Sequence, residues 1–359
     1  MPYQVVRGFV VACCVILVSS ACVHRPAQKE FIPPQFPPLP AEPRFVYDAS
    51  LRNSRAVLEP TTSEKLQSIL TGKNFEPIGL AKPFDVAVHQ GRIYVSDTQQ
   101  RAVLLFDTIN KQFKIIGTEG KGMLLKPMGI VISKQLQELF VVDISAKRIA
   151  VFDLEGKYKR QIGRPADFVR PTGIAISNNG EKIYVVETGG INSDDHHVLI
   201  LDSQSGKLIK KVGHRGTQDG EFNIPLSITV TPDGDFFVID SGNFRVQRFS
   251  HNGIYKSQFG SIGRRGGQFS RPKSISSDSQ GNIYVVDTAF GNFQIFTPQG
   301  QLLLHVGDRG TSGGPARFML PAGIDVDEQG RVYMIDQFFR KLEIFLPSGI
   351  EALPLLVKH

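Results

Sequence analysis

The chain is poor in cysteine, and this limits the chemistry that it can perform. All three cysteines, Cys13, Cys14 and Cys22, lie near the N-terminus of the 359 residues, so the rest of the chain has no disulfide and no thiolate ligand. The sequence has no Cys-x-x-Cys-His for covalent haem, and no Gly-x-x-x-x-Gly-Lys-Ser/Thr follows its Gly-rich loops. It also lacks a nucleophile elbow and a paired-carboxylate signature, which makes an enzyme the less favoured interpretation.

Long apolar runs are also lacking. The run from Gly8 to Val18 follows Arg7, has the length of a signal-peptide apolar region and is too short to span a bilayer. We therefore predict a signal peptide over residues 1–21 and an exported protein. Ser19-Ser20-Ala21 before Cys22 resembles a bacterial lipobox, although Ser19 departs from its usual Leu, Val or Ile. The resemblance implies lipidation of Cys22, with plain secretion as the alternative, and Val23 after it implies the outer membrane.

A proline-rich stretch follows, at residues 31–43. Such a sequence does not form a helix or a central strand and favours polyproline II, which rises about 3.1 Å per residue. We interpret residues 22–43 as a lipid-anchored cysteine and a tether that holds the remaining chain away from a membrane. A ligand for a proline-recognition module is the less favoured alternative.

Six units of similar length make up most of the remaining chain. Successive opening prolines lie 44 to 54 residues apart, and an acid follows each proline after 14 to 16 residues. The prolines are Pro83, Pro127, Pro171, Pro225, Pro272 and Pro321, and the acids are Asp97, Asp143, Glu187, Asp240, Asp287 and Asp336. Within the fourth unit, residues 227–231, 236–239, 246–249 and 255–259 predict four short strands separated by Gly-containing turns.

This unit has the length and the strand content of a propeller blade. A lone four-stranded sheet cannot bury both faces, whereas six sheets placed radially cover each other. We predict an all-β fold, a six-bladed β-propeller of four-stranded antiparallel blades over residues 44–359. The ring closes through residues 45–51 or 350–357, and we favour the N-terminal segment. Residues 62–72 predict one short N-terminal helix, capped by Thr62 or Ser63 and ended by Gly72.

The same residues resemble the NHL repeat. Its pattern is Pro, then Gly-Ile, then Ile-Tyr-Val-x-Asp, then Arg-x-x-x-Phe, with Gly-x-Phe before the next Pro; residues 220–249 and 267–296 are the best copies. The resemblance covers about residues 82–345 and implies the propeller fold. It does not specify a function, because NHL propellers include scaffolds, RNA binders and metal-dependent lyases.

Basic and aromatic residues gather in two sets of loops. The loops after the second and the fourth strand of each blade emerge on the same side of a propeller, which we call the top face. The predicted partner-binding residues are Arg101, Arg148, His197, Phe244, Arg245, Phe290, Phe338, Phe339 and Arg340 after second strands, and Arg215, Arg264 and Arg309 after fourth strands. We expect ion pairs between the second-strand acids and the arginines after them, and inter-blade packing is the alternative role for the phenylalanines.

The third unit has a longer loop than the others, from Gly189 to His197. It contains Asp194, Asp195 and His196 beside His197, yet adjacent residues of an extended segment point in opposite directions, and a metal site needs three or more convergent ligands. We therefore predict a solvated loop rather than a metal site. At the channel mouth only Asp85 supplies a carboxylate among the first residues of the inner strands, which we take as too little for a catalytic metal.

The charge is consistent with an anionic partner. The net charge is +7, and removal of the predicted leader, with one arginine and no acid, leaves +6. We predict a non-catalytic scaffold of the bacterial envelope that binds a protein partner through the top face, without cofactor or metal. A nucleic-acid partner is not expected, because export would separate the protein from the RNA of the cell and because the loops offer few exposed aromatic residues that could stack on bases. The alternatives are a metal-dependent lyase or lactonase at the channel, and a receptor for an anionic glycan or small ligand.

Overall fold

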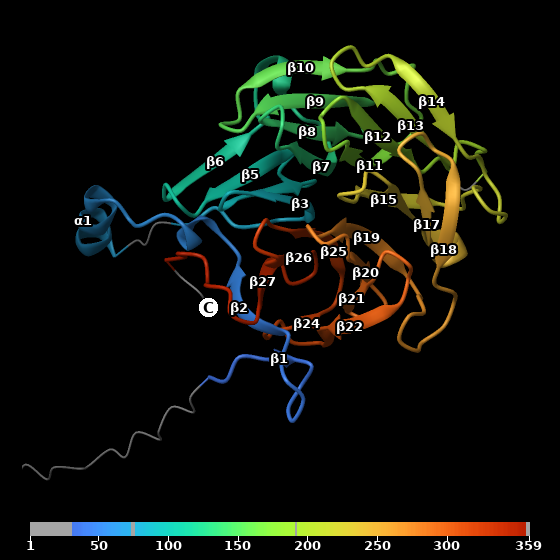
Figure 1. The fold of residues 1–359 in the computed structure, drawn as a ribbon. Coiled ribbons are helices and arrows are strands. Elements are labelled where there is room, and N and C mark those ends of the chain that lie inside the picture. Colours follow the sequence, from blue (N-terminus) through green and yellow to red (C-terminus); the bar gives the residue numbers. More distant parts are fainter. Residues whose placement is uncertain (1–30, 73–75, 191, 357–359) are drawn as a thin grey trace, which may run out of the picture. The chain divides into compact units, whose positions relative to one another are not determined.

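A computed structural model of the protein describes residues 31–72, 76–190 and 192–356 (Figure 1). The chain divides into two units, Met1–Ile32 and Pro33–His359. Of the first unit, only Phe31 and Ile32 are described, so the predicted signal peptide and Cys22 lie outside the described residues. The second unit contains the propeller. Within the described residues, no helix is both long enough and apolar enough to cross a membrane.

The predicted six blades are present, each an antiparallel sheet (Figure 1). The first three consist of β3 (Pro83–His89), β4 (Arg92–Asp97), β5 (Ala102–Asp107) and β6 (Gln112–Ile116); β7 (Pro127–Ser133), β8 (Glu138–Asp143), β9 (Arg148–Asp153) and β10 (Tyr158–Ile162); and β11 (Pro171–Ile176), β12 (Lys182–Glu187), β13 (His197–Asp202) and β14 (Leu208–Val212). The fourth and fifth consist of β15 (Pro225–Val230), β16 (Phe236–Asp240), β17 (Arg245–Phe249) and β18 (Tyr255–Phe259); and β19 (Pro272–Ser277), β20 (Ile283–Asp287), β21 (Asn292–Phe296) and β22 (Leu302–Val306). Each opening proline starts an inner strand, and each predicted acid ends the second strand.

The sixth blade closes the ring with a strand from the N-terminal side, as predicted. This blade contains β25 (Pro321–Val326), β26 (Val332–Asp336) and β27 (Lys341–Pro347). Its fourth strand is β2 (Phe45–Leu51), which pairs antiparallel with β27 at the outer side of the blade. A two-stranded pair, β23 (Asp308–Arg309) and β24 (Arg317–Phe318), lies in the loop before this blade. The ring is therefore held at the junction of its two ends by main-chain hydrogen bonds.

Part of the predicted tether belongs to the propeller. The short strand β1 (Gln35–Phe36) pairs with β2 as a fifth strand of the sixth blade, and the Phe36 ring packs edge-on against Phe345 at 6.1 Å. Proline is tolerated beside an edge strand because no further strand needs its missing N–H. The segment that is fastened to the propeller thus begins near Pro34, whose carbonyl accepts from the Tyr47 amide, and not at residue 44.

Apolar side chains fill the spaces between adjacent blades. One cluster joins blades one and two through residues such as Val103 and Phe152, and another joins blade six to blade one through Ile93 and Leu342. Successive side chains of each strand point to opposite faces of its blade, so the side chains of neighbouring sheets interdigitate across the gap. This packing fixes the inner strands around the channel.

The helix α1 (Thr62–Thr71) precedes the first blade (Figure 1). Its N-cap is Thr61, not Thr62 or Ser63, because the Thr61 hydroxyl accepts from the Glu64 amide in a capping box. It ends as predicted at Gly72, whose φ of 68° suits glycine. The three apolar residues of one face, Leu66, Ile69 and Leu70, are exposed. The short 3-10 helices are Ser54–Ala56, Gly120–Gly122 and Ser241–Asn243.

Candidate functional site: the top face and the central channel

The second-strand acids hold the top-face loops in place. Asp97 accepts from the amides of Ala81 and Lys82, the two residues before Pro83, at 2.7 and 2.9 Å. The proline itself has no amide to offer, so the carboxylate satisfies the last two donors of the loop. Equivalent pairs of contacts are made by Asp143, Glu187, Asp287 and Asp336, and Asp240 accepts from one such amide, that of Asn223.

These acids are therefore not mainly partners of arginines. The expected intra-blade ion pair forms in the fourth blade, where the Arg245 Nε lies 2.8 Å from the Asp240 Oδ2. Among the other described second-strand acids, no such pair with an arginine is present. Arg148 instead donates to the backbone carbonyls of Lys121 and Met123. The backbone N–H groups already donate hydrogen bonds to these carboxylates, so a cation is not needed in every blade.

The predicted partner-binding residues differ widely in exposure. Arg245 and His197 are buried, so neither offers its side chain to a partner, and burial lowers the pKa of His197 to about 4. Half-buried members are Arg148, Phe244, Phe290 and Phe339, and Phe244 packs against the core between blades four and five. Exposed members are Arg101, Arg215, Arg264, Arg309, Phe338 and Arg340. Of these, Arg215 and Arg309 donate to backbone carbonyls of the third and fifth blades.

Three of these exposed predicted residues are free. Arg101, Arg264 and Arg340 make no side-chain hydrogen bond or ion pair with the part of the chain that the structure describes. Phe338, next but one to Arg340, is 56% exposed and meets the Phe339 ring edge-on at 5.1 Å. The top face thus presents cations without intramolecular partners beside an exposed aromatic ring.

The long loop of the third blade anchors its neighbour. The His196 side chain is buried, and its Nδ1 accepts from the Ile224 amide at 3.1 Å. Ile224 directly precedes Pro225, so His196 takes one of the amides that an acid accepts in the other blades. Within the described residues, no group of three His, Cys, Asp or Glu side chains converges as a metal site. The contacts of the loop are structural ones.

The six inner strands surround a central channel. Each inner strand contacts the inner strands of both neighbouring blades, and all six start at the top face. Gly129, Gly173 and Gly323 stand near their starts, and a Cβ atom at any of them would lie 2.6 to 2.7 Å from the backbone of the adjacent blade. Only glycine permits this approach. The channel is consequently narrow at this level, with a cavity on either side.

One cavity, of about 210 Å³, opens at the top face and is called the upper mouth. Phe84, Met128 and Leu226 give it an apolar wall, and Lys273 and Arg170 bring positive charge to it. The Lys273 ammonium lies 5.6 Å from the centroid of the Phe84 ring. Burial lowers the pKa of Lys273 to about 8. Sequence reasoning did not single out this lysine, although it directly follows the opening proline of blade five.

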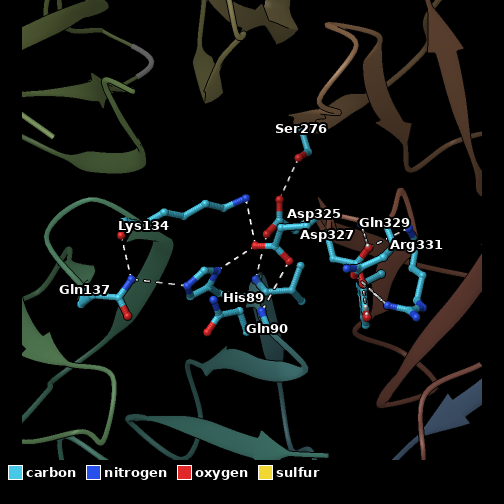
Figure 2. Close-up of polar contacts among 12 residues, drawn as sticks. His89, Gln90, Lys134, Gln137, Ser276, Asp325, Asp327, Gln329 and Arg331 are labelled. Atoms are coloured by element: carbon cyan, nitrogen blue, oxygen red, sulfur yellow. Dashed lines mark hydrogen bonds and ion pairs between the residues drawn. The ribbon is translucent and has the colours of Figure 1, made fainter. Parts of the chain in front are cut away.

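The second cavity, of about 350 Å³, lies at the opposite end of the inner strands and is called the lower mouth. Its wall contains a polar network that joins blades one, two, five and six (Figure 2). Ser276 donates to Asp325 at 2.8 Å, and the Nδ1 of His89 lies 2.7 Å from the Oε1 of Glu328. Lys134 reaches the same carboxylate oxygen at 3.0 Å. Asp325 was not among the predicted channel residues.

Two carboxyl groups of the inner strands, those of Asp85 and Asp325, line the channel, and both have structural contacts. Asp85 accepts from the Ile130 amide at 3.1 Å, and Asp325 accepts from the Val88 amide at 2.8 Å. Each bond therefore connects one inner strand to the next. Burial raises the pKa of Asp85 to about 7 and that of Asp325 to about 6. Both carboxyl groups thus connect adjacent blades.

Comparisons with known proteins agree with this architecture. Residues 222–249 match the family model described as the NHL repeat, and residues 123–190 match one described as a 6-bladed beta-propeller. The first match covers the blade with the predicted Gly-x-Phe to Arg-x-x-x-Phe pattern.

Curated relatives share segments of this chain. The protein brain tumor of Drosophila melanogaster is 29% identical over 144 residues, which are 39% of this chain and 13% of that protein. The E3 ubiquitin-protein ligase TRIM32 of Homo sapiens is 43% identical over 49 residues, 14% of this chain and 8% of the ligase. A probable peptidyl-alpha-hydroxyglycine alpha-amidating lyase of Caenorhabditis elegans is 29% identical over 119 residues, 32% of each chain. The chain thus spans a third or less of these relatives.

Solved structures share the fold at low identity. A protein of unknown function from Bacteroides thetaiotaomicron has a TM-score of 0.58 at 17% identity, over 75% of this chain and 70% of that one. A gluconolactonase from Xanthomonas campestris has a TM-score of 0.57 at 17% identity, over 75% of this chain and 87% of that one. A streptogramin B lyase has a TM-score of 0.52 at 13% identity, over 75% of this chain and 94% of that one. At this level of identity, the similarity concerns the fold.

Proposed function

Because residues 222–249 form an NHL repeat and the chain folds as a six-bladed propeller, we propose that this NHL-type propeller is a non-catalytic binding scaffold. It engages a protein partner through its top face. The observation that supports this proposal is the set of exposed, unpartnered arginines, Arg101, Arg264 and Arg340, beside the exposed ring of Phe338.

The charges of the top face support a proposal that the partner is acidic. Three acids of the same loops are engaged locally: Asp167 with Arg164, Glu221 with His214 and Asp308 with Arg317. The free arginines are thus left to attract negative charge, and solvent-exposed charges steer encounter more than they add affinity. An acidic protein surface with an apolar spot for Phe338 fits this arrangement. Its association would slow as ionic strength rises.

A charge-reversal experiment tests this function. Full-length protein is cross-linked in intact cells of its source, and captured proteins are compared between wild type and Arg264→Glu/Arg340→Glu. The matched control is Lys157→Glu/Lys207→Glu, whose exposed lysines lie in turns between third and fourth strands, away from the top face. We expect one specific protein with wild type and control and its loss from the top-face variant. Equal capture by both variants would contradict the proposal.

We further propose that the scaffold is exported to the bacterial envelope and held there by a lipid on Cys22, as an outer-membrane lipoprotein. The support is the apolar run after Arg7 and the Ser-Ser-Ala-Cys sequence. Metabolic labelling with an alkyne fatty acid tests this directly. We expect label in the wild type and in Cys13→Ser/Cys14→Ser, and no label in Cys22→Ser. Labelling of the Cys22 variant would rule out this anchor.

A further inference from the structure

The upper mouth has the composition of a ligand site. Its apolar wall of Phe84, Met128 and Leu226 faces two cationic side chains, Lys273 and Arg170. Small-molecule sites commonly combine a mainly apolar lining with a few placed polar groups. At about 210 Å³, this cavity is smaller than the usual range of about 300–1,000 Å³, so it suits a group of a few heavy atoms.

Lys273 has unused hydrogen-bonding capacity in this cavity. Its Nζ donates to the Gln337 Oε1 at 3.1 Å, and within the described residues it forms no ion pair. An ammonium group carries three donors, and Gln337 is neutral. A half-buried cation without an ion-pair partner is unfavourable, and burial accordingly lowers the pKa of Lys273 to about 8. An anion in the cavity would relieve this cost.

The other polar groups of the mouth narrow the choice of ligand. The Thr188 hydroxyl donates to the Pro225 carbonyl at 2.7 Å and lies 2.5 Å from the Thr172 hydroxyl, so these groups are occupied. Arg170 donates to the Gly189 carbonyl at 3.3 Å, and its remaining N–H groups are available. Asp85, Ser227 and Ser274 also line the mouth, and among its polar groups the two cations are the ones that attract an anion. Planar carboxylates suit a guanidinium and an ammonium.

We propose that the upper mouth binds a carboxylate that carries a short apolar group. Lys273 pairs with the carboxylate, Arg170 contacts it from the rim, and the apolar group lies against Phe84, Met128 and Leu226. A free small acid or a carboxylate of a protein segment can supply this chemistry. The site is distinct from the free arginines of the top face, so it does not depend on the scaffold function.

Binding is expected to weaken with increasing pH. The charged groups around Lys273 are Lys82 and Asp85 at β3, Arg271 before β19, Asp336 at the end of β26, and Arg170 before β11. As pH rises through about 8, Lys273 loses its proton and Asp85, whose pKa burial raises to about 7, gains negative charge. Both changes disfavour an anion. A site that relied on exposed arginines alone would keep its affinity in this range.

Calorimetric titration of the propeller with butyrate tests the site. Butyramide, which has nearly the same shape and no charge, is the matched ligand. Lys273→Met retains the apolar stem, and Lys126→Met removes an exposed cation that directly precedes another inner strand and does not line the mouth. We expect butyrate to bind wild type and Lys126→Met alike, and Lys273→Met about tenfold or more weakly, since a charge-assisted hydrogen bond is lost. Butyramide should bind none of them measurably.

Further arms identify the source and protect the test against misfolding. A short peptide with a free C-terminal carboxylate, and its C-terminal amide, are titrated in the same way. Tighter binding of the free-acid peptide than of butyrate indicates a protein-borne carboxylate, whereas equal or weaker binding indicates a free acid.

If Lys273→Met does not fold, two measurements on wild type test the proposal instead: its preference for butyrate over butyramide, and the loss of this preference between pH 7 and about 9. No butyrate or peptide binding, or equal affinity for butyramide, overturns the proposal. Arg264→Glu/Arg340→Glu should retain butyrate binding, which separates this site from the partner surface.

Discussion

The Nδ1 of His89 lies 2.7 Å from the Oε1 of Glu328, so a polar contact joins the first blade to the sixth. His89 ends the inner strand β3, and Glu328 stands in the turn after β25. Lys134 of the second blade contacts the same oxygen at 3.0 Å. Three blades thus meet at one carboxylate on the rim of the lower mouth.

This junction should stabilise the ring above acidic pH. Burial would raise the pKa of Glu328, but the contacts with His89 and Lys134 outweigh it and hold the pKa at about 2. The contribution is fully present above the ordinary value of 4.5 and is lost as pH falls toward 2. Urea unfolding from pH 6 to 2.5 should show wild type losing about 1–2 kcal/mol more than Glu328→Gln. Glu155→Gln, at an exposed partner of Arg92, is the control; identical pH profiles for wild type and Glu328→Gln would contradict the assignment.

A second pair is buried in the sixth blade. The side chains of Lys341 and Glu343 are in direct contact and almost completely inaccessible, and Glu343 also accepts from the Ala316 amide at 2.9 Å. Lys341→Met leaves a buried carboxylate without its cation, and should lower the free energy of unfolding by about 3–5 kcal/mol. Lys341→Met/Glu343→Leu should recover much of this loss. Denaturant titration measures both, and a double variant no more stable than the single one would argue against a charge-based cause.

The N-terminal strand should be essential to the ring. Removal of residues 1–51 deletes β2 and leaves the edge of β27 unpaired, and open edges promote aggregation. Removal of residues 1–33 keeps β1 and β2. We expect the variant that lacks residues 1–33 to be monomeric with a sharp thermal transition. The variant that lacks residues 1–51 should aggregate or unfold broadly at lower temperature. Light scattering with circular dichroism compares them, and equal stability would show that another contact closes the ring.

Glu187 should make the protein less stable at alkaline pH. Burial raises its pKa from 4.5 to about 7, so its contribution is present below pH 4.5 and is lost as pH rises through 7. Glu187→Gln stays neutral throughout. Relative to wild type, this variant should gain about 2 kcal/mol in unfolding free energy between pH 4 and 8. The exposed Glu181 of the same blade provides the control, Glu181→Gln, and a pH-independent difference for Glu187→Gln would disprove this explanation.

Much of the fold was predictable because its local signals repeat. Each opening proline and each second-strand acid stands at a strand boundary, and the backbone explains both. The acid accepts from amides just before the proline, and the proline adds no further N–H that would need an acceptor. Closure by residues 45–51, which was favoured over residues 350–357, is confirmed by the pairing of β2 with β27. The cap at Thr61 differs by one residue, which is within the ordinary variation of helix starts.

The site was less predictable, because exposure depends on neighbours in space. Arg245 begins a third strand, as Arg148 does, but Arg148 is half-buried whereas Asp240 and two loop carbonyls surround Arg245 and bury it. Asp325 was missed because only the first residues of each inner strand were considered. All six inner strands contain a bulge just after the proline, and a one-residue irregularity changes which side chains face the channel.

The pairing of β2 with β27 also has a consequence for biosynthesis. The strand that leaves the ribosome early must wait for one that is made near the end of the chain, so no nascent intermediate can complete the sixth blade. Contacts between distant segments form slowly, and unpaired strands are vulnerable meanwhile. Blades one to five can assemble in order as they appear, while β2 has only the short strand β1 beside it until β27 is made. A chaperone that covers an extended apolar segment would act best on residues 45–51.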